Sequence, residues 1–374
     1  MNLMSCNGTE SISIFSEPLK LPNLLYLPNL VVYSPTGIHR SPGHRDATEN
    51  HMMKFSSGNG KFLQYVPAGL VTLLLAMLLS APLPSQADSF SADVGAGMLV
   101  ISKSDNLWGR GKASISSITA SPQNQTVVMA IPALLLRYRQ ESMKNTWFIG
   151  ATEEDYGRVA IGVKHDLEKG AIDAALFYSF MGSEWENPYT LNRNSTSVQN
   201  FGLRAGWEKI AGSPFSAHYT VAAKLVNNDL SGARYPDLKR DGTKHRLGIN
   251  YTLKLADSLV LTPSLAFERE IADGSANRYS SPIGAVSLVW RLQNVTWINR
   301  VSGSYAIHDT TNPVFGTTLK EPGYGATSLV LWKNPFDFKK YWVTTGVVYE
   351  QTLPNITFFE KRSNYFFLLG GYSF

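Results

Sequence analysis

Hydrophobic and polar residues alternate in steps of two along much of the chain. Apolar residues take every second position in four clear runs, at 201–208, 215–225, 246–255 and 259–268. Runs of about ten residues with this period, separated by turn residues, are typical of membrane strands that have lipid on one face and a lumen on the other. The pattern predicts an all-β fold, a transmembrane antiparallel up-and-down β-barrel.

The last residues of the chain form another such run. Its apolar face carries Phe366, Leu368, Gly370, Tyr372 and Phe374. A barrel in lipid has to use its last strand to close the ring, because an open sheet edge cannot be satisfied in hydrocarbon. We therefore expect this strand to pair with the first one, near 90–100, and Tyr372 and Phe374 to act as the signal that the barrel-assembly machinery recognises.

The connections between the runs alternate in length. Short turns are expected near 140–145, 166–170, 210–213, 256–257, 293–294 and 334–339. Longer polar loops are expected near 103–125, 152–157, 182–196, 228–243, 270–280, 308–321 and 351–361. Together they join about 14 strands, an even number that places both termini in the periplasm. Residues 126–136 are apolar on both faces and fit either a plug or a mis-phased strand, so about 12 strands is the alternative.

The amino-terminal part has the features of an export signal. An apolar stretch at 66–79 follows Lys54 and Lys61 and precedes Ser85-Gln86-Ala87, a small-x-small cleavage site. The stretch is shorter than the roughly 20 residues that a membrane helix needs. The prediction is a signal peptide at 52–87 cleaved after Ala87, a barrel domain at 88–374, and a mis-start or disordered presequence at 1–51. Cys6, the only cysteine, lies in that first stretch.

Aromatic residues gather near the predicted short turns. Indole and phenol rings favour the lipid–water interface, where an apolar body and a polar tip are both satisfied. The expected girdle consists of Trp207, Trp290, Trp297, Trp332, Tyr341 and Trp342.

The polar faces of the runs would line the lumen. The candidate lining residues are Arg204, His218, Lys224, Arg246, Lys254, Glu268, Arg291 and Arg300, and Lys164 with Asp173 is a candidate ion pair. Pairing the strands through their connections also places Lys224 near Arg246 and Arg246 near Glu268. One interpretation is a mildly cation-rich pore wall that favours anions. The other is a lumen packed by cross-strand ion pairs.

Other chemistry finds little support. The formal net charge of +5 is too weak and dispersed for nucleic acid. His218 shares a face with Ser216 but has no third member of a catalytic set. The acidic run at 153–155 could bind a cation, although a solvated loop tip explains it as well. Lys239 and Arg240 could contact lipopolysaccharide phosphates. No catalytic residue, cofactor or metal site is predicted.

Several stretches resemble a proteobacterial family of predicted outer-membrane barrels that is catalogued only as a domain of unknown function. They are FIGA at 148–151, EWENPY at 184–189, EKIAGSPF at 208–215, NPVFG at 312–316, GYG at 323–325, NPF at 334–336 and the final aromatic strand. The resemblance covers about 145–374. It implies a signal peptide and an outer-membrane barrel, and no known substrate, active site or cofactor.

These observations leave three hypotheses for function. The first is a porin-like channel in the bacterial outer membrane for passive passage of small hydrophilic solutes, with a bias toward anions. The second is an outer-membrane hydrolase, which would require a serine and a histidine brought together from different strands. The third is a non-conducting structural or receptor barrel. The expected partners are outer-membrane lipid and lipopolysaccharide, with periplasmic chaperones and the barrel-assembly machinery during biogenesis.

Overall fold

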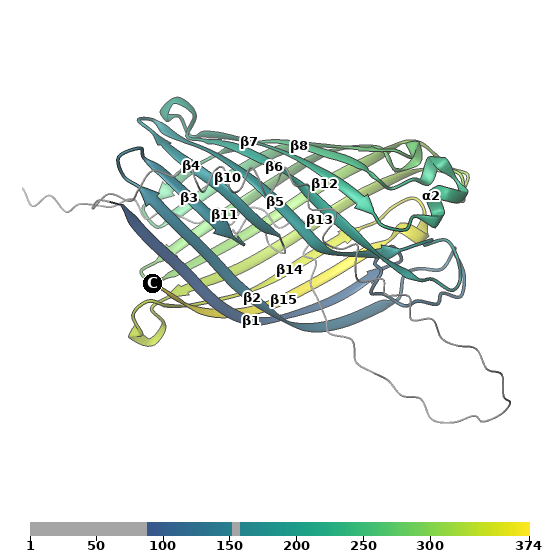
Figure 1. Cartoon of the computed structure of the whole chain (residues 1–374), viewed down its shortest axis with the longest axis horizontal. Coiled ribbons are helices and arrows are strands. Elements are labelled where there is room, and N and C mark those ends of the chain that lie inside the picture. The colour runs from purple at the N-terminus through teal and green to yellow at the C-terminus, as the bar shows by residue number, and fades with distance from the viewer. Residues whose placement is uncertain (1–87, 152–157) are drawn as a thin grey trace, which may run out of the picture.

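One closed antiparallel sheet makes up almost all of the fold (Figure 1). The computed structural model describes residues 88–151 and 158–374. The predicted signal peptide, the stretch before it with Cys6, and the acidic run at 153–155 lie outside the described residues. Among the residues that are described, no helix is long and apolar enough to cross a membrane.

The strands follow one another around the ring in chain order. They are β1 (Ser89–Asp105), β2 (Asn124–Gln140), β3 (Asn145–Gly150), β4 (Val159–Leu167), β5 (Gly170–Trp185), β6 (Ser195–Glu208), β7 (Phe215–Val226), β8 (Gly242–Tyr251), β9 (Leu253–Ala256), β10 (Leu259–Ala272), β11 (Tyr279–Leu292), β12 (Val295–Asn312), β13 (Thr317–Lys333), β14 (Tyr341–Thr352) and β15 (Lys361–Ser373). A short helix, α2 (Leu230–Arg234), lies in one loop, and single 3-10 turns occur at Ile210–Gly212, Pro236–Leu238, Ser275–Asn277, Pro335–Asp337 and Thr357–Phe359.

The ring has 14 strands, as the sequence predicts. β8 and β9 are one strand interrupted at Thr252, since both pair with β10. β15 pairs with β1 along its length, with Phe367 opposite Leu99, and this closes the barrel. The alternative of 12 strands is wrong, because β2 pairs with β1 from Ser104↔Asn124 to Ser89↔Arg139. Residues 126–136 are therefore wall and not plug.

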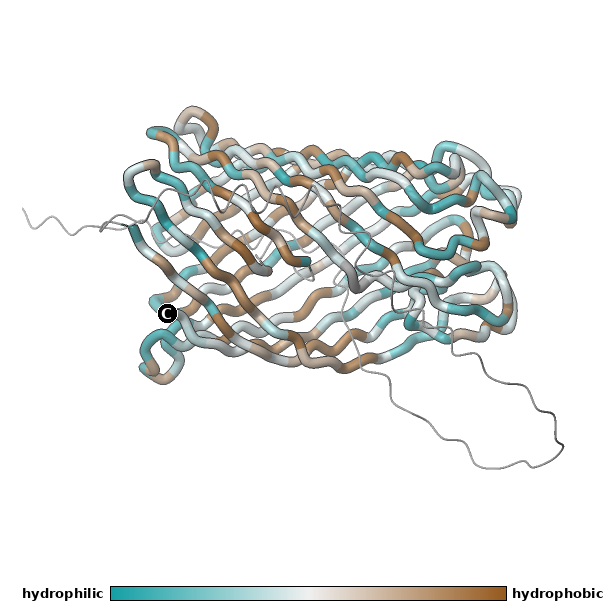
Figure 2. Tube along the Cα trace, viewed as in Figure 1, coloured by the Kyte–Doolittle hydropathy of each residue, from teal (hydrophilic) through white to brown (hydrophobic). Residues whose placement is uncertain are grey.

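The two faces of each strand meet different surroundings. In β15, Phe366 is 42% exposed on the outer face, whereas its neighbour Phe367 is 5% exposed on the inner face. Figure 2 shows hydrophobic residues along the strands and hydrophilic residues at both ends of the barrel. This distribution suits a barrel with an apolar outer surface against lipid. The backbone groups of neighbouring strands pair with one another within the wall.

The connections differ between the ends as predicted. Six short turns, at 141–144, 168–169, 209–214, 257–258, 293–294 and 334–340, lie at the end that we call the turn end. The two-residue turn after β11 places Gln293 at φ 46°, as tight hairpins require. The other end, the loop end, carries the longer loops. The connection expected at 308–321 is shorter, because β12 and β13 continue to a turn at 313–316 in which Gly316 has φ 64°.

Candidate functional site in the lumen

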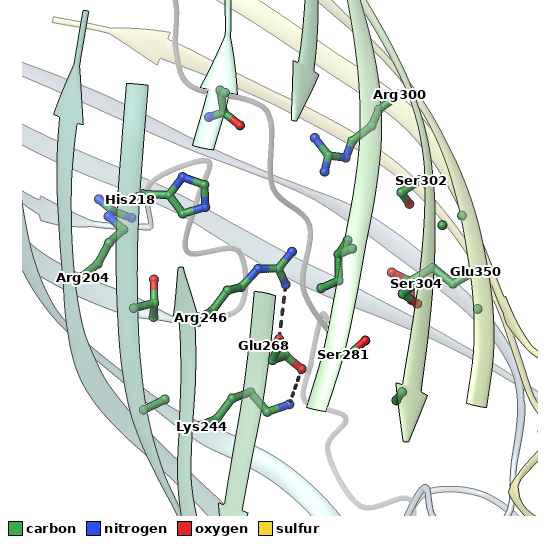
Figure 3. A pocket seen from close by; sticks show the side chains of 18 of the residues that line it. Arg204, His218, Lys244, Arg246, Glu268, Ser281, Arg300, Ser302, Ser304 and Glu350 are labelled. Atoms are coloured by element: carbon green, nitrogen blue, oxygen red, sulfur yellow. Dashed lines mark hydrogen bonds and ion pairs between the residues drawn. The ribbon is translucent and has the colours of Figure 1, made fainter. Parts of the chain in front are cut away.

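A polar cavity of about 600 Å³ lies inside the barrel. Its basic lining residues are Lys103, Arg158, Arg204, Lys244, Arg246, Arg300 and Lys361, and its acidic ones are Asp173, Glu208, Glu268, Glu321 and Glu350. Figure 3 labels ten of the lining residues, which come from strands on several sides of the lumen. Serine, threonine and glycine fill much of the remaining wall. The described wall is thus hydrophilic, with basic residues in modest excess.

Glu268 is the centre of one charge cluster. The register of β8 and β10 places it opposite Arg246, as predicted, and Arg246 Nη1 lies 3.3 Å from Glu268 Oε2. Lys244 Nζ lies 3.3 Å from the other carboxylate oxygen, and the Tyr279 hydroxyl donates to that oxygen at 2.7 Å. Two cations and a phenol therefore satisfy a carboxylate that little water reaches, which is the condition for burying a charge.

A second cluster involves the predicted pair Lys164 and Asp173. The β4–β5 hairpin places the two residues opposite each other. Their salt bridges nevertheless run elsewhere, because Lys164 Nζ lies 2.6 Å from Glu208 and Asp173 lies 3.5 Å from Arg204 Nε. The predicted ion pair is therefore wrong in its partners. Flexible side chains reach the next strand but one as easily as the directly opposite residue.

The other predicted lining residues are spread along the barrel. Arg204, His218 and Arg300 line the cavity. The ring of His218 lies over Gly248, where an added Cβ would come within 2.3 Å of it. Arg291 lies near the turn end opposite Thr296, outside the set of cavity-lining residues.

Two predicted lysines also lie outside the described cavity lining. Lys254 is 67% exposed at the turn end, where it pairs with Asp257. Lys224 is opposite Gly242 and binds Glu184 at 2.6 Å. Its expected proximity to Arg246 is wrong, because the register places Arg246 opposite Thr220.

The prediction from sequence omitted several residues that line the cavity. Lys103, Lys361 and Glu321 fell in or beside predicted loops, although β1, β15 and β13 extend through them. Lys244 lies two positions before Arg246, on the same face of β8, and one residue beyond the loop predicted at 228–243. Extending the alternation into the loops by two or three residues would have found these residues.

The inner wall also has an apolar region, which we call the apolar stripe. It consists of Leu99, Ile101, Met129, Val260, Val289, Ile298, Leu329, Val348, Tyr365, Phe367 and Leu369. Directly opposite partners carry it from strand to strand, from Val260–Val289 in β10 and β11 to Leu99–Met129 in β1 and β2. In β14 its row passes through Gly346, over which Leu329 and Phe367 extend. The stripe slopes from the turn end at β10 toward the loop end at β2.

The aromatic residues at the turn end divide between the two faces. Trp207, Trp290, Trp297 and Tyr341 are exposed on the outer face, and Trp290 stacks on Trp297 with ring centroids 6.3 Å apart. Trp332 contacts Phe336 beside them. The prediction that Trp342 belongs to the girdle is wrong. Successive side chains of a strand point to opposite faces, so Trp342, directly after Tyr341, points inward and packs against Gly95, Gly371 and the apolar stripe.

The carboxyl terminus lies at the same end. The ring of Tyr372 contacts those of Tyr341 and Phe374, and the backbone N–H of Phe374 donates to the carbonyl of Ala92 at 2.8 Å. The last residue is thereby fixed beside β1.

Arg240 joins three segments at the loop end. Its guanidinium lies 3.2 Å from the Glu184 carboxylate and 2.7 Å from that of Asp229, and it donates to the Trp185 carbonyl at 2.8 Å. Burial disfavours the charged form of Asp229, but the hydrogen bonds and charge of Arg240 outweigh it and hold the pKa of Asp229 below its usual 3.8. The protein itself thus holds this guanidinium, and contact of Lys239 and Arg240 with lipopolysaccharide phosphates stays a prediction.

The hydrogen bonds of three histidines bear on nucleophilic chemistry. His165, His245 and His308 bond to Asn145, Tyr219 and Glu321 respectively, and His245 Nε2 also lies 3.3 Å from the Thr243 hydroxyl oxygen. Within the described residues, no group of three His, Cys, Asp or Glu side chains could hold a metal ion.

The chain belongs to the family described as "Protein of unknown function (DUF2860)", whose model matches residues 89–373. The family membership implied by the sequence motifs is confirmed. Comparison with curated proteins gives no match.

The solved structures to which the chain is similar are outer-membrane barrels. The "CymD monoaromatic hydrocarbon channel" has 10% identity and a TM-score of 0.42, with 76% of this chain and 88% of that chain covered. The outer membrane channel DcaP of Acinetobacter baumannii has 10% identity and a TM-score of 0.35, with 78% and 99% covered. OmpT, an outer membrane protein of Vibrio cholerae, has 8% identity and a TM-score of 0.36, with 78% and 99% covered. Likeness at this level says nothing about the solute.

Proposed function

We propose that the barrel is a passive, porin-like channel of the bacterial outer membrane for small hydrophilic solutes, with a bias toward anions. The observation that carries the proposal is the polar cavity inside the closed ring, with its excess of basic residues. Fixed positive charge on a pore wall lowers the energy of an entering anion, and hydroxyl groups replace part of its hydration.

Two competing functions have less support. A hydrolase needs a nucleophile, a base and an orienting group hydrogen-bonded in one set. His165 and His308 bond to an amide and a carboxylate, and His245 bonds to a phenol and to the Thr243 hydroxyl, so the described bonds of these three histidines join no hydroxyl, imidazole and carboxylate in one set. A non-conducting barrel would need a lumen closed by contacts such as those around Glu268. That alternative differs from ours in a measurable property, the conductance.

The test is single-channel recording with purified residues 88–374 in a planar bilayer. We expect discrete current steps. Their absence across repeated reconstitutions, with a correctly folded barrel shown by heat-modifiable gel mobility, would leave the packed lumen as the better account.

The anion bias is tested by the reversal potential in a KCl gradient. Arg246→Gln removes a positive charge from the cavity and should move the reversal potential toward that of a cation-selective pore. Glu268→Gln, its matched partner across β8 and β10, should move the potential in the opposite direction. Equal reversal potentials in both variants would remove the role assigned to these charges.

We also propose how the chain reaches its membrane. The signal peptide at 52–87 is removed after Ala87, the assembly machinery recognises Tyr372 and Phe374, and the exposed aromatic side chains at the turn end rest at the interface of lipid or lipopolysaccharide with water. Amino-terminal sequencing of protein from isolated outer membranes should begin at Asp88. A start elsewhere in the barrel domain would move the cleavage site.

A further inference from the structure

Among the described residues, the barrel wall is incomplete beside β2. β3 has six residues, whereas its neighbour β2 has 17. A strand rises about 3.3 Å per residue, so β3 is about 20 Å long even before tilt, and a tilted membrane strand needs about 9–11 residues. β3 therefore cannot cross the apolar part of a bilayer.

The edge of β2 beyond the end of β3 has no strand partner among the described residues. β2 pairs with β3 only from Leu135↔Gly150 to Gln140↔Asn145, and the final contact is the Ala151 N–H donating to the Leu134 carbonyl at 3.0 Å. On the far side, β4 ends at Val159 opposite Tyr178, while β5 continues to Trp185. Within the part of the chain that the structure describes, no ladder lies between these two strand edges.

The opening has a top as well as two sides. The segment after β1 crosses to β5, where Trp108 bridges Glu184 and the Gly109 N–H donates to the Ser183 carbonyl at 3.0 Å. We call the area enclosed by the β2 edge, the ends of β3 and β4, the β5 edge and this crossing the side window. It is defined by the described residues alone.

The sequence of β2 removes one backbone donor from the open edge. Backbone groups of successive residues point to opposite sides of a strand, and the Leu134 carbonyl points toward β3. Residue 132, two positions on, therefore points into the side window, and it is a proline. Proline has no N–H to leave unpaired, which is why it is tolerated at sheet edges. The first backbone position that would expose an unpaired N–H in the side window therefore has no N–H.

Both faces of β2 are apolar along the side window. On the outer face, Val128 is 57% and Leu134 is 48% exposed, which places this edge in the lipid-facing band. On the inner face, Met129 belongs to the apolar stripe, and Val127 and Ile131 pack against it. A strand beside a continuous wall needs only one apolar face, so the second one calls for an apolar surface inside the barrel.

The apolar stripe leads to the side window and follows the basic cavity. It reaches β2 at Met129, on the edge of the opening. Charged residues that line the cavity stand two positions beyond stripe residues on the same strand face: Arg300 from Ile298, Lys103 from Ile101 and Glu350 from Val348. An apolar track bordered mainly by cations is complementary to a molecule with an apolar chain and an anionic head.

We propose that the side window is a lateral route between the lumen and the bilayer for single-chain amphipaths with an acidic head group, whose apolar chain follows the stripe. This route goes beyond the axial passage of hydrophilic solutes. It requires that a reagent confined to the membrane can reach the inner face of β2, and that it cannot reach the inner face of a fully paired strand.

Cysteine accessibility tests the opening. The described residues contain no cysteine, so single cysteines can be placed in the barrel without a background. Ile131→Cys lies on the inner face at the side window, and Ala222→Cys lies on the inner face of β7, which pairs with β6 and β8 on its two sides. Val128→Cys on the outer face serves as the positive control. The reagent is a phospholipid with a maleimide on its acyl chain, in vesicles that contain the folded barrel.

We expect the lipid maleimide to label Ile131→Cys and Val128→Cys and to leave Ala222→Cys unlabelled. Labelling of Val128→Cys without Ile131→Cys would mean that the wall is closed at β2 and would overturn the proposal. Neither result depends on ion conductance, so failure of the side window and failure of the axial channel are distinguishable.

Binding of a fluorescent amphipath tests the stripe. The probe is dansyl-undecanoate, added to the barrel in vesicles of lipids brominated on their acyl chains. Met129→Gln replaces a buried apolar group of the stripe by a polar one of similar length and should weaken binding about tenfold. Met98→Gln makes the same change on the outer face of β1 and should leave binding unaltered.

Two further readouts decide the remaining points. Bromine quenching of the bound probe would place it in contact with lipid through the wall, and its absence would contradict the lateral route. Dodecanoate should compete with the probe more strongly than dodecanol does. Equal competition would overturn the assignment of an acidic head group, and equal affinity of the two methionine variants would overturn the stripe as the track.

Discussion

The two halves of the inner wall solve the same packing problem with opposite chemistry. From β4 to β10 the wall carries charges such as Asp173, Arg204 and Glu268, joined across neighbouring strands. From β12 around to β2 it carries most of the apolar stripe, with Leu329 and Phe367 near its centre. In both halves a glycine gives room to a large neighbour: Gly248 lies beneath His218, and Gly346 lies beneath Leu329 and Phe367. The wall geometry is common to both halves, and only the inward side chains decide what each half can contact.

The stripe half should lose the most stability on truncation. Phe367→Ala removes a buried ring and should lower the free energy of unfolding by about 3–5 kcal/mol, because the neighbouring strands cannot move inward to fill the space. Phe366→Ala, one residue away on the lipid face, should cost less. Urea titrations of the folded barrel in vesicles give both values. Equal losses would mean that lipid-side contacts support β15 as much as the stripe does.

The charged half should respond to loss of a partner rather than loss of volume. Glu268→Ala leaves Lys244 and Arg246 without their shared carboxylate and should cost about 2 kcal/mol, less than a fully buried pair would because the cavity is partly wet. Glu268→Gln keeps an acceptor for the Tyr279 hydroxyl and should cost less. The same urea titrations measure both. A larger loss in the glutamine variant would show that the ion pairs do not stabilise this half.

Alanine substitutions at two glycines test whether both halves depend on a glycine that leaves room for a large neighbouring side chain. Gly346→Ala places a Cβ within 2.3 Å of Leu329, and Gly248→Ala places one within 2.3 Å of His218. Each should cost about 1–2 kcal/mol through displacement of the neighbouring side chain. Gly303→Ala is the control, since its Cβ would meet nothing nearer than 3.9 Å. If one glycine tolerates alanine as Gly303 does, only the other half depends on such a glycine.

The architecture was readable from sequence because a strand between lipid and lumen has to alternate. The alternation of side chains predicted that Arg246 lies near Glu268, and the alternation of short turns with longer loops predicted 14 strands. The prediction failed where a strand runs beyond the lipid into a loop, as at Lys103, and where two adjacent aromatics were assigned to one face, as at Tyr341 and Trp342. Side-chain partners such as Lys164–Glu208 depend on reach across two strands, which spacing along the chain does not encode.

Residues 126–136 show what an exception to the pattern can mean. Apolarity on both faces departs from the alternation expected between lipid and a polar lumen, and from sequence it was consistent with a plug or a mis-phased strand. In the structure this segment is the wall beside the shortest strand, with lipid on one face and the stripe on the other. The missing information was the length of β3, because an early end of the neighbouring strand leaves no signal within β2 itself.

The smallest predicted effect concerns the loop end, where charge is held by a buried arginine instead of by a wet wall. The pKa of Asp229 is lowered in the folded state, so its contribution to stability is present above its unfolded pKa, near 3.8, and is lost as the pH falls through the lower folded pKa. Asp229→Asn keeps the side-chain acceptor but removes the charge. We expect the wild-type melting temperature to exceed that of Asp229→Asn by a few degrees at neutral pH, and the difference to disappear below that window. A difference that persists unchanged at low pH would show that Asp229 acts through hydrogen bonds alone, and that the loop end does not depend on the ionised pair with Arg240.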